Sequence, residues 1–582
     1  MSSMLRKVLW TSAAVIFLAL SIWFFGHRQL GGFDMSALID TGWRIASGQR
    51  PYIDFPLTTP VLFYIGAGLA VWLWGAKWSA FVLAAIAMAV LAFLAQLYLL
   101  ARILSWKHSL AIALVCQMLT GVVTAYWWYN SVSVSIACVF LTAAYVFASQ
   151  PEKRGSAYAL WASLLLLVLT KPNIAGSAAF LIFVVLILFS PYRGRVFLIY
   201  FAALISFFLV LFALKLNPVD VLRSYMEMSK NRGMPSFAWF INDKPFEHLV
   251  TLPLLVLSLL PMLERMLAGL VRWKANREQL KGLWPHFMIS LVVFAVGLFS
   301  MFTNSDSNLA VGLPFFVLGG SVFCLLLPFD AELAISSKLF MIIALSCVAA
   351  SFFGCAIMNG FVPHAFVIDE GSYFNILIAS LSILGVLFFG ESFHLFSNAA
   401  RLLKRFFAFE NLIWILLFAC AVVSVYAGAM RWRVRYIGPD LFYTDEPLVQ
   451  IHDIPFFENF WISPRTQTMM AEVKTVLSEK YTRPENWKNA PIYFGPRIGF
   501  SYAAFGVASP LDFPIWWHPN NSFSDIYTDH YIQSFLDHKF EVCIFFGSGT
   551  PDVVFLPDPI LNSLSTDYNR VDYSDIIVYI RR

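Results

Sequence analysis

Charged residues are scarce in this sequence. Asp, Glu, Lys and Arg make up 13% of its 582 residues, whereas a soluble domain carries about 25%. Hydrophobic residues reach 59% and the mean hydropathy is +0.70, which excludes a water-soluble protein for most of the chain. The net charge of +5 is spread over many loops, so we expect no nucleic-acid partner.

Cysteine is rare outside the hydrophobic stretches. Six of the seven cysteines lie in or beside apolar segments, and only Cys543 falls in the final region 431–582, so that region cannot close an internal disulfide. No Cys or His residues have the spacing of a zinc site. We therefore predict no metal ligands and no cofactor, and a divalent metal ion stays an open alternative without support from these residues.

Fourteen apolar segments fill residues 1–430, most of them close to the roughly 20 residues that span a bilayer as a helix. Arg6 and Lys7 precede the first segment, and no convincing cleavage site follows it, so we expect an uncleaved first span. The segments cover residues 8–25, 57–75, 79–101, 109–126, 131–149, 157–170, 174–190, 196–215, 248–268, 285–302, 309–328, 339–358, 374–391 and 411–430.

Positive charge predicts the orientation of these segments, because loops rich in Lys and Arg stay in the cytoplasm. The N-terminus is then cytoplasmic, and residues 431–582 lie outside the plasma (inner) membrane. That arrangement requires an odd number of crossings. One of the fourteen segments must fail to cross, and segment 57–75, with Pro56 and Pro60 at its start, is the expected in-plane or re-entrant one. The cytoplasmic loops are marked by Arg102, Lys107, Lys153, Arg154, Arg193, Arg195, Arg265, Arg272, Lys274, Arg277, Lys281, Arg401, Lys404 and Arg405.

The last region has the composition of an ordinary domain. Short β-like runs at 491–494, 542–546 and 575–580 and a helix-like stretch at 465–480 predict a small soluble α/β domain. The predicted fold is therefore a polytopic α-helical membrane protein with about 13 transmembrane helices, comprising a membrane domain (1–430) and an extracytoplasmic domain (431–582).

The first outside loop, 26–56, contains an amphipathic pattern. Asp34 precedes it, where an Asp is a natural helix N-cap, and Gly48 ends it. This pattern predicts a helix that lies flat at the interface with its apolar face in lipid. The apolar stripe comprises Met35, Leu38, Ile39, Gly42, Ile45 and Ala46, and Asp40, Arg44 and Ser47 lie off it.

The same loop resembles the first loop of GT-C glycosyltransferases, membrane enzymes that take a sugar from a polyprenyl-phosphate carrier. The resemblance rests on Asp34, the helix that follows, Gly48, and Pro51-Tyr52 with Asp54 before a proline-bounded apolar segment. It implies that Asp34 is an acidic residue that serves catalysis, and that the membrane domain is GT-C-like.

A second resemblance lies at Lys171-Pro172-Asn173, where an apolar helix ends outside and returns. Related enzymes carry a lysine-containing break there, near the lipid phosphate. The chain departs from the protein O-mannosyltransferases and aminoarabinose transferases at three places. Those enzymes carry an acidic pair, or a His-Pro-Pro or Lys-Pro-Pro signature before the next segment, whereas here Met35 follows Asp34 and the later site reads Phe55-Pro56-Leu57. Tyr129-Asn130 stands where they tend to have an Asp.

Transfer from a phosphate-linked sugar needs a base for the acceptor hydroxyl and positive charge on the leaving phosphate. Asp34 or Asp54 can be the base, and Lys171 with Asn173 can meet the phosphate. Arg44 and Tyr52 are further candidates to bind substrate or lipid phosphate. Simpler alternatives stay open, because Asp34 can act only as a cap, Lys171 can snorkel to the surface, and Arg44 can anchor at the interface.

Other outside turns add candidate binding residues. Asn130 lies at one turn, and Asn304 and Asp306 lie in the polar run 303–308, which can bind sugar hydroxyls or serve as a plain hydrophilic turn. His364 stands near Asp369 and Glu370, whose spacing is not diagnostic of a metal site.

These features predict an inverting glycosyltransferase of cell-envelope or polysaccharide biosynthesis. It moves a sugar from a polyprenyl-phosphate donor to a lipid, glycan or protein acceptor at the outer face of the bilayer. A transporter or flippase of lipid-linked glycans, or a polysaccharide polymerase or ligase, is the alternative. The polar groups cluster at the outer surface and the halves show no mutual similarity, which favours surface chemistry over transit.

Overall fold

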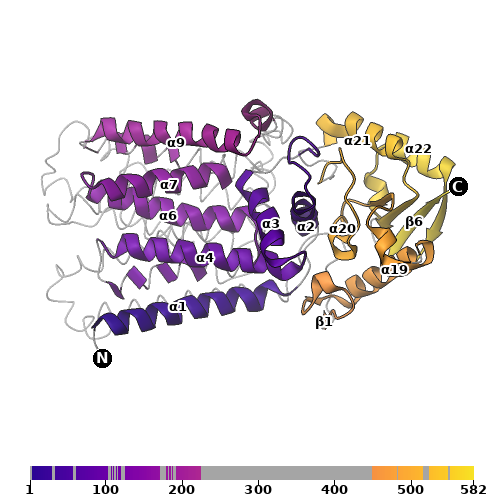
Figure 1. Cartoon of the computed structure of the whole chain (residues 1–582), viewed down its shortest axis with the longest axis horizontal. Helices are drawn as coiled ribbons and strands as arrows, with labels where there is room; N and C mark the ends of the chain where they lie inside the picture. Colours follow the sequence, from indigo (N-terminus) through magenta and orange to yellow (C-terminus); the bar gives the residue numbers. More distant parts are fainter. Residues whose placement is uncertain are drawn as a thin grey trace, which may run out of the picture.

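The computed structural model describes residues 3–28, 33–56, 61–102, 125–170, 192–223, 448–481, 483–515, 524–547 and 551–582, and scattered positions within 106–118 and 179–190. In the described part of the membrane domain, five long helices run side by side (Figure 1). They are α1 (Ser3–Gly26), α4 (Trp78–Leu100), α6 (Tyr129–Ser149), α7 (Arg154–Thr170) and α9 (Arg193–Ala213).

Three of the described helices are long and apolar enough to cross a membrane, namely Met4–Gly26, Trp78–Leu100 and Arg193–Ala213. Large apolar side chains on α9 face outward, with Leu209 61% and Phe212 64% exposed, as expected of helices solvated by lipid. These observations support the polytopic membrane class. Most of the remaining predicted spans lie outside the described residues, so the total of about 13 stays a prediction.

The basic loops gather at one end of this bundle. Gln150 after α6 donates to the Arg102 carbonyl after α4 at 3.4 Å, and Tyr192 before α9 donates to Glu152 at 3.0 Å. At the opposite end, Trp78 at the start of α4 meets Phe460 of the C-terminal domain, with ring centroids 5.3 Å apart. Basic loops and C-terminal domain therefore lie at opposite ends, which is the arrangement that the charge pattern predicts.

Helix α3 (Val61–Trp74) differs from its neighbours in direction, because it runs across the end of the bundle beside the C-terminal domain (Figure 1). Its 14 residues span about 21 Å at 1.5 Å per residue, which is short of a hydrocarbon core of about 30 Å. Helix α3 lies in segment 57–75, which we expected not to cross because the number of crossings must be odd. Its place in the structure supports the interpretation that it does not cross.

The C-terminal domain is a small α/β unit with a four-stranded sheet in the order β3-β4-β6-β5. Strands β3 and β4 are parallel, and the other two pairings are antiparallel. The three predicted strand runs and the predicted helix are confirmed. The elements are β1 (Val449–Gln450), η4 (Pro455–Phe457), β2 (Trp461–Ile462), α19 (Pro464–Lys480), η5 (Pro484–Trp487), β3 (Ile492–Phe494), α20 (Ser501–Phe505), α21 (Ser524–His538), β4 (Val542–Phe546), η6 (Asp552–Phe555), α22 (Asp558–Asp567), β5 (Tyr568–Asp572) and β6 (Ile576–Arg581).

Local sequence explains the elements that position this domain. Ser463 caps α19 by accepting a hydrogen bond from the Thr466 N–H at 3.1 Å, and Pro464 opens the helix.

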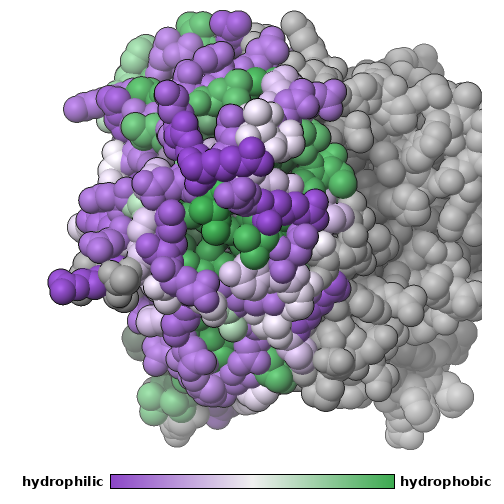
Figure 2. Space-filling model, turned by 90° about the vertical axis from the view of Figure 1, so that its right-hand side faces the viewer, coloured by the Kyte–Doolittle hydropathy of each residue, from purple (hydrophilic) through white to green (hydrophobic). Residues whose placement is uncertain are grey.

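The end of the domain that faces away from the bundle is largely hydrophilic, with smaller hydrophobic areas between (Figure 2). That surface suits an aqueous compartment.

A buried ion pair fixes the loop that leaves β3. The Arg497 guanidinium donates to Asp552, and both side chains are almost fully buried. The Arg497 guanidinium carbon lies 4.6 Å from the Phe546 ring centroid, and Asp552 also accepts from the Phe546 N–H at 3.4 Å. Burial raises the pKa of Asp552, while Arg497 opposes the rise. The pair therefore sets the path of the chain just before Gly499, where it reaches the membrane domain.

Replacing Arg497 by Met should destabilise this domain by about 3–5 kcal/mol, because it leaves the Asp552 carboxyl buried without its partner. The loss is measured by heating the full chain with a protease and following cleavage of the C-terminal domain. The double change Arg497→Met with Asp552→Asn should lose less stability than the single change. Equal stability of the native chain and of Arg497→Met would contradict this account of the pair.

Candidate functional site

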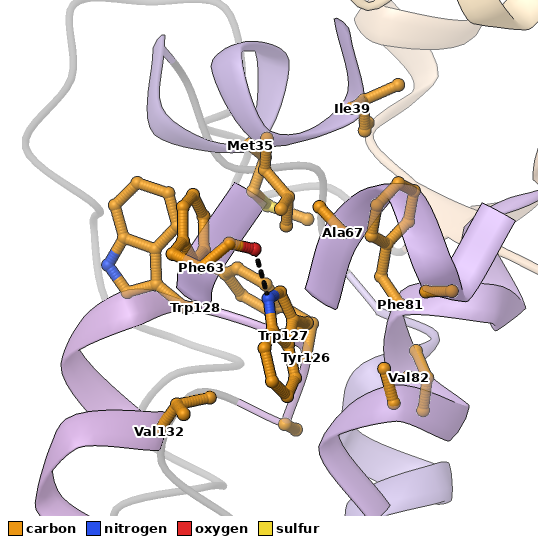
Figure 3. Packing of buried hydrophobic residues seen from close by; sticks show 14 of the residues in the cluster. Met35, Ile39, Phe63, Ala67, Phe81, Val82, Tyr126, Trp127, Trp128 and Val132 are labelled. Carbon is orange, nitrogen blue, oxygen red and sulfur yellow. Dashed lines mark hydrogen bonds between the residues drawn. The ribbon is translucent and has the colours of Figure 1, made fainter. Parts of the chain in front are cut away.

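Helix α2 (Phe33–Ala46), formed by the first outside loop, lies between the membrane helices and the C-terminal domain (Figure 1). Most of its apolar stripe is buried against protein, since Met35, Leu38 and Ile39 are each no more than 2% exposed, and only Ala46 at its end is exposed. Met35 points from α2 toward Ala67 and Trp127 (Figure 3). The prediction that this stripe lies in lipid is wrong.

Glycines explain why protein replaces lipid against this stripe. A Cβ added to Gly68 of α3 would lie 2.3 Å from Ile45, and one added to Gly42 of α2 would lie 3.0 Å from the Phe81 ring. The missing side chains let α2 settle closely on α3 and α4. Hydrophobic periodicity shows that a face is apolar, but it does not show which apolar surface covers it.

An aromatic floor, defined as Phe63, Phe81, Trp127 and Trp128, lies under α2 (Figure 3). The Trp127 indole donates to the Phe63 carbonyl at 2.7 Å (Figure 3), and the Trp127 N–H donates to the Phe81 carbonyl at 3.0 Å. Phe63 and Trp128 meet edge to face with centroids 5.3 Å apart. These contacts hold the start of α6 beneath the start of α2.

The polar face of α2 meets residues 499–512 of the C-terminal domain along a line that we call the seam. Ser36 accepts from the Phe500 N–H at 2.9 Å, and the Trp43 indole donates to the Val507 carbonyl at 2.8 Å. Asp40 accepts from the Ser509 hydroxyl at 2.6 Å. Asp40, one of the polar residues that the sequence places off the apolar stripe, therefore contacts another domain.

Arg44 completes the seam. Its guanidinium donates to Asp40 at 2.9 Å and to the Pro510 carbonyl at 2.6 Å, and a third contact joins it to Gln49 at 3.3 Å. Gln49 in turn donates to the Ser509 carbonyl at 2.7 Å. A buried guanidinium that already meets these oxygens has little left for a phosphate, so we do not carry Arg44 into the proposed phosphate site.

Asp54 and Tyr52 belong to a tight turn after α2. Asp54 accepts from the Arg50 N–H at 2.7 Å and from the Arg50 guanidinium at 3.0 Å, and these hydrogen bonds lower the pKa of Asp54. Tyr52 adopts φ of +63° and donates its N–H to the Phe55 carbonyl at 3.0 Å. A carboxylate with a lowered pKa is a weaker base, so Asp34 is the better candidate of the two.

The structure places two further predicted residues on adjoining elements. Asp34 lies in the first turn of α2, one residue inside the helix rather than before it, and Asn130 is the second residue of α6. Because Met35 and Trp128 share the aromatic floor region (Figure 3), the two helix starts lie close together. Lys171, Asn173, Asn304, Asp306 and His364 lie outside the described residues.

Sequence reasoning missed two residues of α2, Ser36 and Trp43, and their partners in the C-terminal domain. Ser36 and Trp43 continue the polar face at positions 36, 40, 43 and 44, which is a helical spacing, and this was a usable clue. Their partners at 500–510 lie in an ordinary-looking loop.

Among the described residues, no group of three or more His, Cys, Asp and Glu side chains is placed to hold a metal ion.

Comparisons with known proteins give distant likenesses. The apo structure of ArnT from Cupriavidus metallidurans is 13% identical, with a TM-score of 0.43 over 100% of this chain and 98% of that one. The same enzyme bound to undecaprenyl phosphate gives 11% identity, a TM-score of 0.37, and coverage of 99% and 98%. The apo Archaeoglobus fulgidus oligosaccharyltransferase gives 12%, 0.46, and coverage of 92% and 69%.

No protein-family model and no curated relative matches the chain. ArnT and the oligosaccharyltransferase belong to the GT-C group that the first loop resembles. With TM-scores below 0.5, these likenesses carry no part of the argument for activity, which rests on the residues of the first loop.

The seam can be tested by a disulfide between Ser36→Cys and Gly499→Cys. A Cβ at position 499 lies 3.3 Å from the Ser36 hydroxyl oxygen, so a sulfur at position 36 falls within bonding reach after small adjustments. We expect mild oxidation of the full chain to protect both new thiols from labelling by a maleimide polymer. Ser47→Cys with Gly499→Cys is the control, since Ser47 is exposed beyond the far end of α2. Equal labelling of both pairs after oxidation would show that α2 does not dock on this domain.

Proposed function

We propose that this protein is a glycosyltransferase that moves a sugar from a polyprenyl-phosphate donor to a lipid, glycan or protein acceptor. The supporting observation is the setting of α2. An acid in its first turn lies at the end of the bundle opposite the basic loops, where membrane helices and a hydrophilic domain meet. A donor with a lipid tail and a polar sugar needs both environments at once.

Asp34 would serve as the general base. It takes the proton from the acceptor hydroxyl, whose oxygen attacks the anomeric carbon of the donor sugar. The bond from that carbon to the phosphate oxygen breaks, and the electron pair leaves with polyprenyl phosphate. Direct displacement inverts the sugar, and no covalent enzyme intermediate is required.

Lys171 and Asn173 would stabilise the leaving phosphate. A lysine at the end of an apolar helix is costly unless it meets an anion or water, and charge developing on the phosphate oxygen is the group that a fixed cation stabilises most. Asn130 would assist from the start of α6. Tyr52, Asn304, Asp306 and His364 remain proposed contacts to sugar or lipid.

Charge placement in the bundle supports surface chemistry over transport. In the described helices α1, α4, α6, α7 and α9, charged side chains occur only in the first two turns. The buried polar groups deeper in the bundle are neutral, with Gln96 donating to Thr142 at 3.3 Å and Gln117 to Gln96 at 3.3 Å. Such hydrogen bonds join helices, whereas a transporter carries ionisable groups near the midplane.

We propose that the N-terminus faces the cytoplasm and the C-terminal domain faces the extracytoplasmic side of the inner membrane. The basic loops at Arg102, Arg154 and Arg195 would then lie in the cytoplasm. The sugar would be transferred on the outer face, where polyprenyl-phosphate donors are used in envelope polysaccharide synthesis.

Asp34→Asn should reduce sugar transfer by about 10²–10⁴-fold, which is the usual contribution of a general base. The assay uses the purified full chain in lipid nanodiscs, added membranes as the source of acceptor, and a panel of radiolabelled undecaprenyl-phosphate monosaccharides. Asp54→Asn is the matched control, because Arg50 already engages that carboxylate, and we expect it to retain much of the activity. Undiminished transfer by Asp34→Asn would overturn the proposed function.

Lys171→Met should also impair transfer, whereas Lys171→Arg should retain part of it, because the cation and not the apolar stem is needed. Turnover measured at saturating donor separates this effect from simple lipid binding. A Met variant as active as the native chain would mean that Lys171 only snorkels to the membrane surface.

A further inference from the structure

The seam joins α2 to a single stretch of the C-terminal domain by contacts spread along the whole helix. Near the start of α2, the Phe500 N–H binds Ser36, two residues from Asp34. Farther along, Val507, Ser509 and Pro510 bind Trp43, Asp40 and Arg44. After the helix, the Asp512 N–H donates to the Asp54 carbonyl at 2.8 Å.

These contacts are enclosed. Ser36, Asp40 and Arg44 are each no more than 3% exposed, and Ser509 is 5% exposed. Buried polar groups that lose their partners pay the full cost of desolvation, so separation of the two domains would leave Asp40 and Arg44 incompletely bonded. The docked arrangement is therefore strongly preferred over partial opening.

The opposite face of α2 is also constrained. Met35, Leu38 and Ile39 are buried, Met35 points toward Ala67 and Trp127 (Figure 3), and Gly42 lies against the Phe81 ring of α4. With the floor below and the seam above, residues 35–42 of α2 are all buried, which restrains rotation of the helix. The residues that fix it lie within three turns of Asp34. A displacement of about 1 Å at a catalytic group can cost around 10²-fold in rate.

We propose that Asp40, Trp43 and Ser509 are positioning residues, through which the C-terminal domain holds Asp34 in its working place. The inference rests on the proposed role of Asp34 as the base. It makes the C-terminal domain part of the catalytic apparatus, in addition to any part that it plays in binding an acceptor. The seam residues themselves do not touch the reacting atoms.

Two small changes test the seam without breaking the Asp40–Arg44 pair. Ser509→Ala removes the hydroxyl that donates to Asp40, and Trp43→Phe removes the indole N–H that donates to Val507 but keeps a ring. We expect each to lower kcat about 10-fold with the donor KM changed less than 2-fold, and the double variant to lose more than either. Unchanged kcat in both variants would overturn the proposal.

Arg465→Ala supplies the control. Arg465 pairs with Asp575 at 2.9 Å inside the C-terminal domain, and its described ion pair does not involve α2. We expect its kcat to match the native value. A fall equal to that of Ser509→Ala would mean that general weakening of the domain, and not the seam, controls turnover.

A reversible tether separates positioning from folding. In the Ser509→Ala background, the disulfide between positions 36 and 499 should raise kcat when oxidised, and reduction should lower it again in the same folded sample. Equal rates in the two states, or a slower oxidised state, would overturn the proposal, the latter because α2 would then have to leave the domain during turnover.

Failure of this inference and failure of the proposed function give different results. If Asp34→Asn abolishes transfer while Ser509→Ala and Trp43→Phe remain native, only the positioning role falls. If Asp34→Asn transfers sugar at the native rate, the proposed function is contradicted, and the positioning role that rests on it is contradicted as well.

Discussion

The buried pair between Asp40 and Arg44 is the interaction on which the rest of the arrangement depends. Two opposite charges that are 3% and 2% exposed are costly to remove from water unless their remaining donors and acceptors are bonded. Ser509 and Pro510 supply those bonds from 469 and 466 residues away. The pair therefore binds the first loop to the C-terminal domain. From its sequence this loop looks like a peripheral amphipathic helix, but in the structure it lies between the membrane helices and that domain.

The layer beneath it follows from small residues and aromatic rings. Gly42 and Gly68 permit the close approach of α2 to α3 and α4, and Trp127 bonds the carbonyls of Phe63 and Phe81. Helix α3 lies across the bundle end (Figure 1), and its 14 residues are fewer than the roughly 20 that span a bilayer. A chemical site at this boundary has lipid-solvated helices on one side and a hydrophilic domain on the other, which matches the two halves of a lipid-linked sugar.

The sequence predicted the features that depend on local pattern and missed those that depend on distant partners. Low charge and long apolar runs predict the membrane class, and the runs at 491–494, 542–546 and 575–580 predict β3, β4 and β6. Strand β5 was missed because Tyr568–Asp572 is mostly polar and exposed at a sheet edge. The prediction that the apolar stripe of α2 lies in lipid was wrong, because periodicity does not show which apolar surface covers a face. The sequence placed Asp34 before the helix, whereas the structure has it in the first turn of α2. The seam could not be predicted because it joins residues more than 460 positions apart.

The central claim is that the start of α2 is where a polyprenyl-phosphate donor reacts. The most direct measurement is an electron cryo-microscopy structure of the full chain in nanodiscs with undecaprenyl phosphate. The account predicts phosphate density beside Lys171, at the bundle end that carries α2, with room for a sugar between it and Asp34. Phosphate density at the opposite end, among Arg102, Arg154 and Arg195, would contradict it.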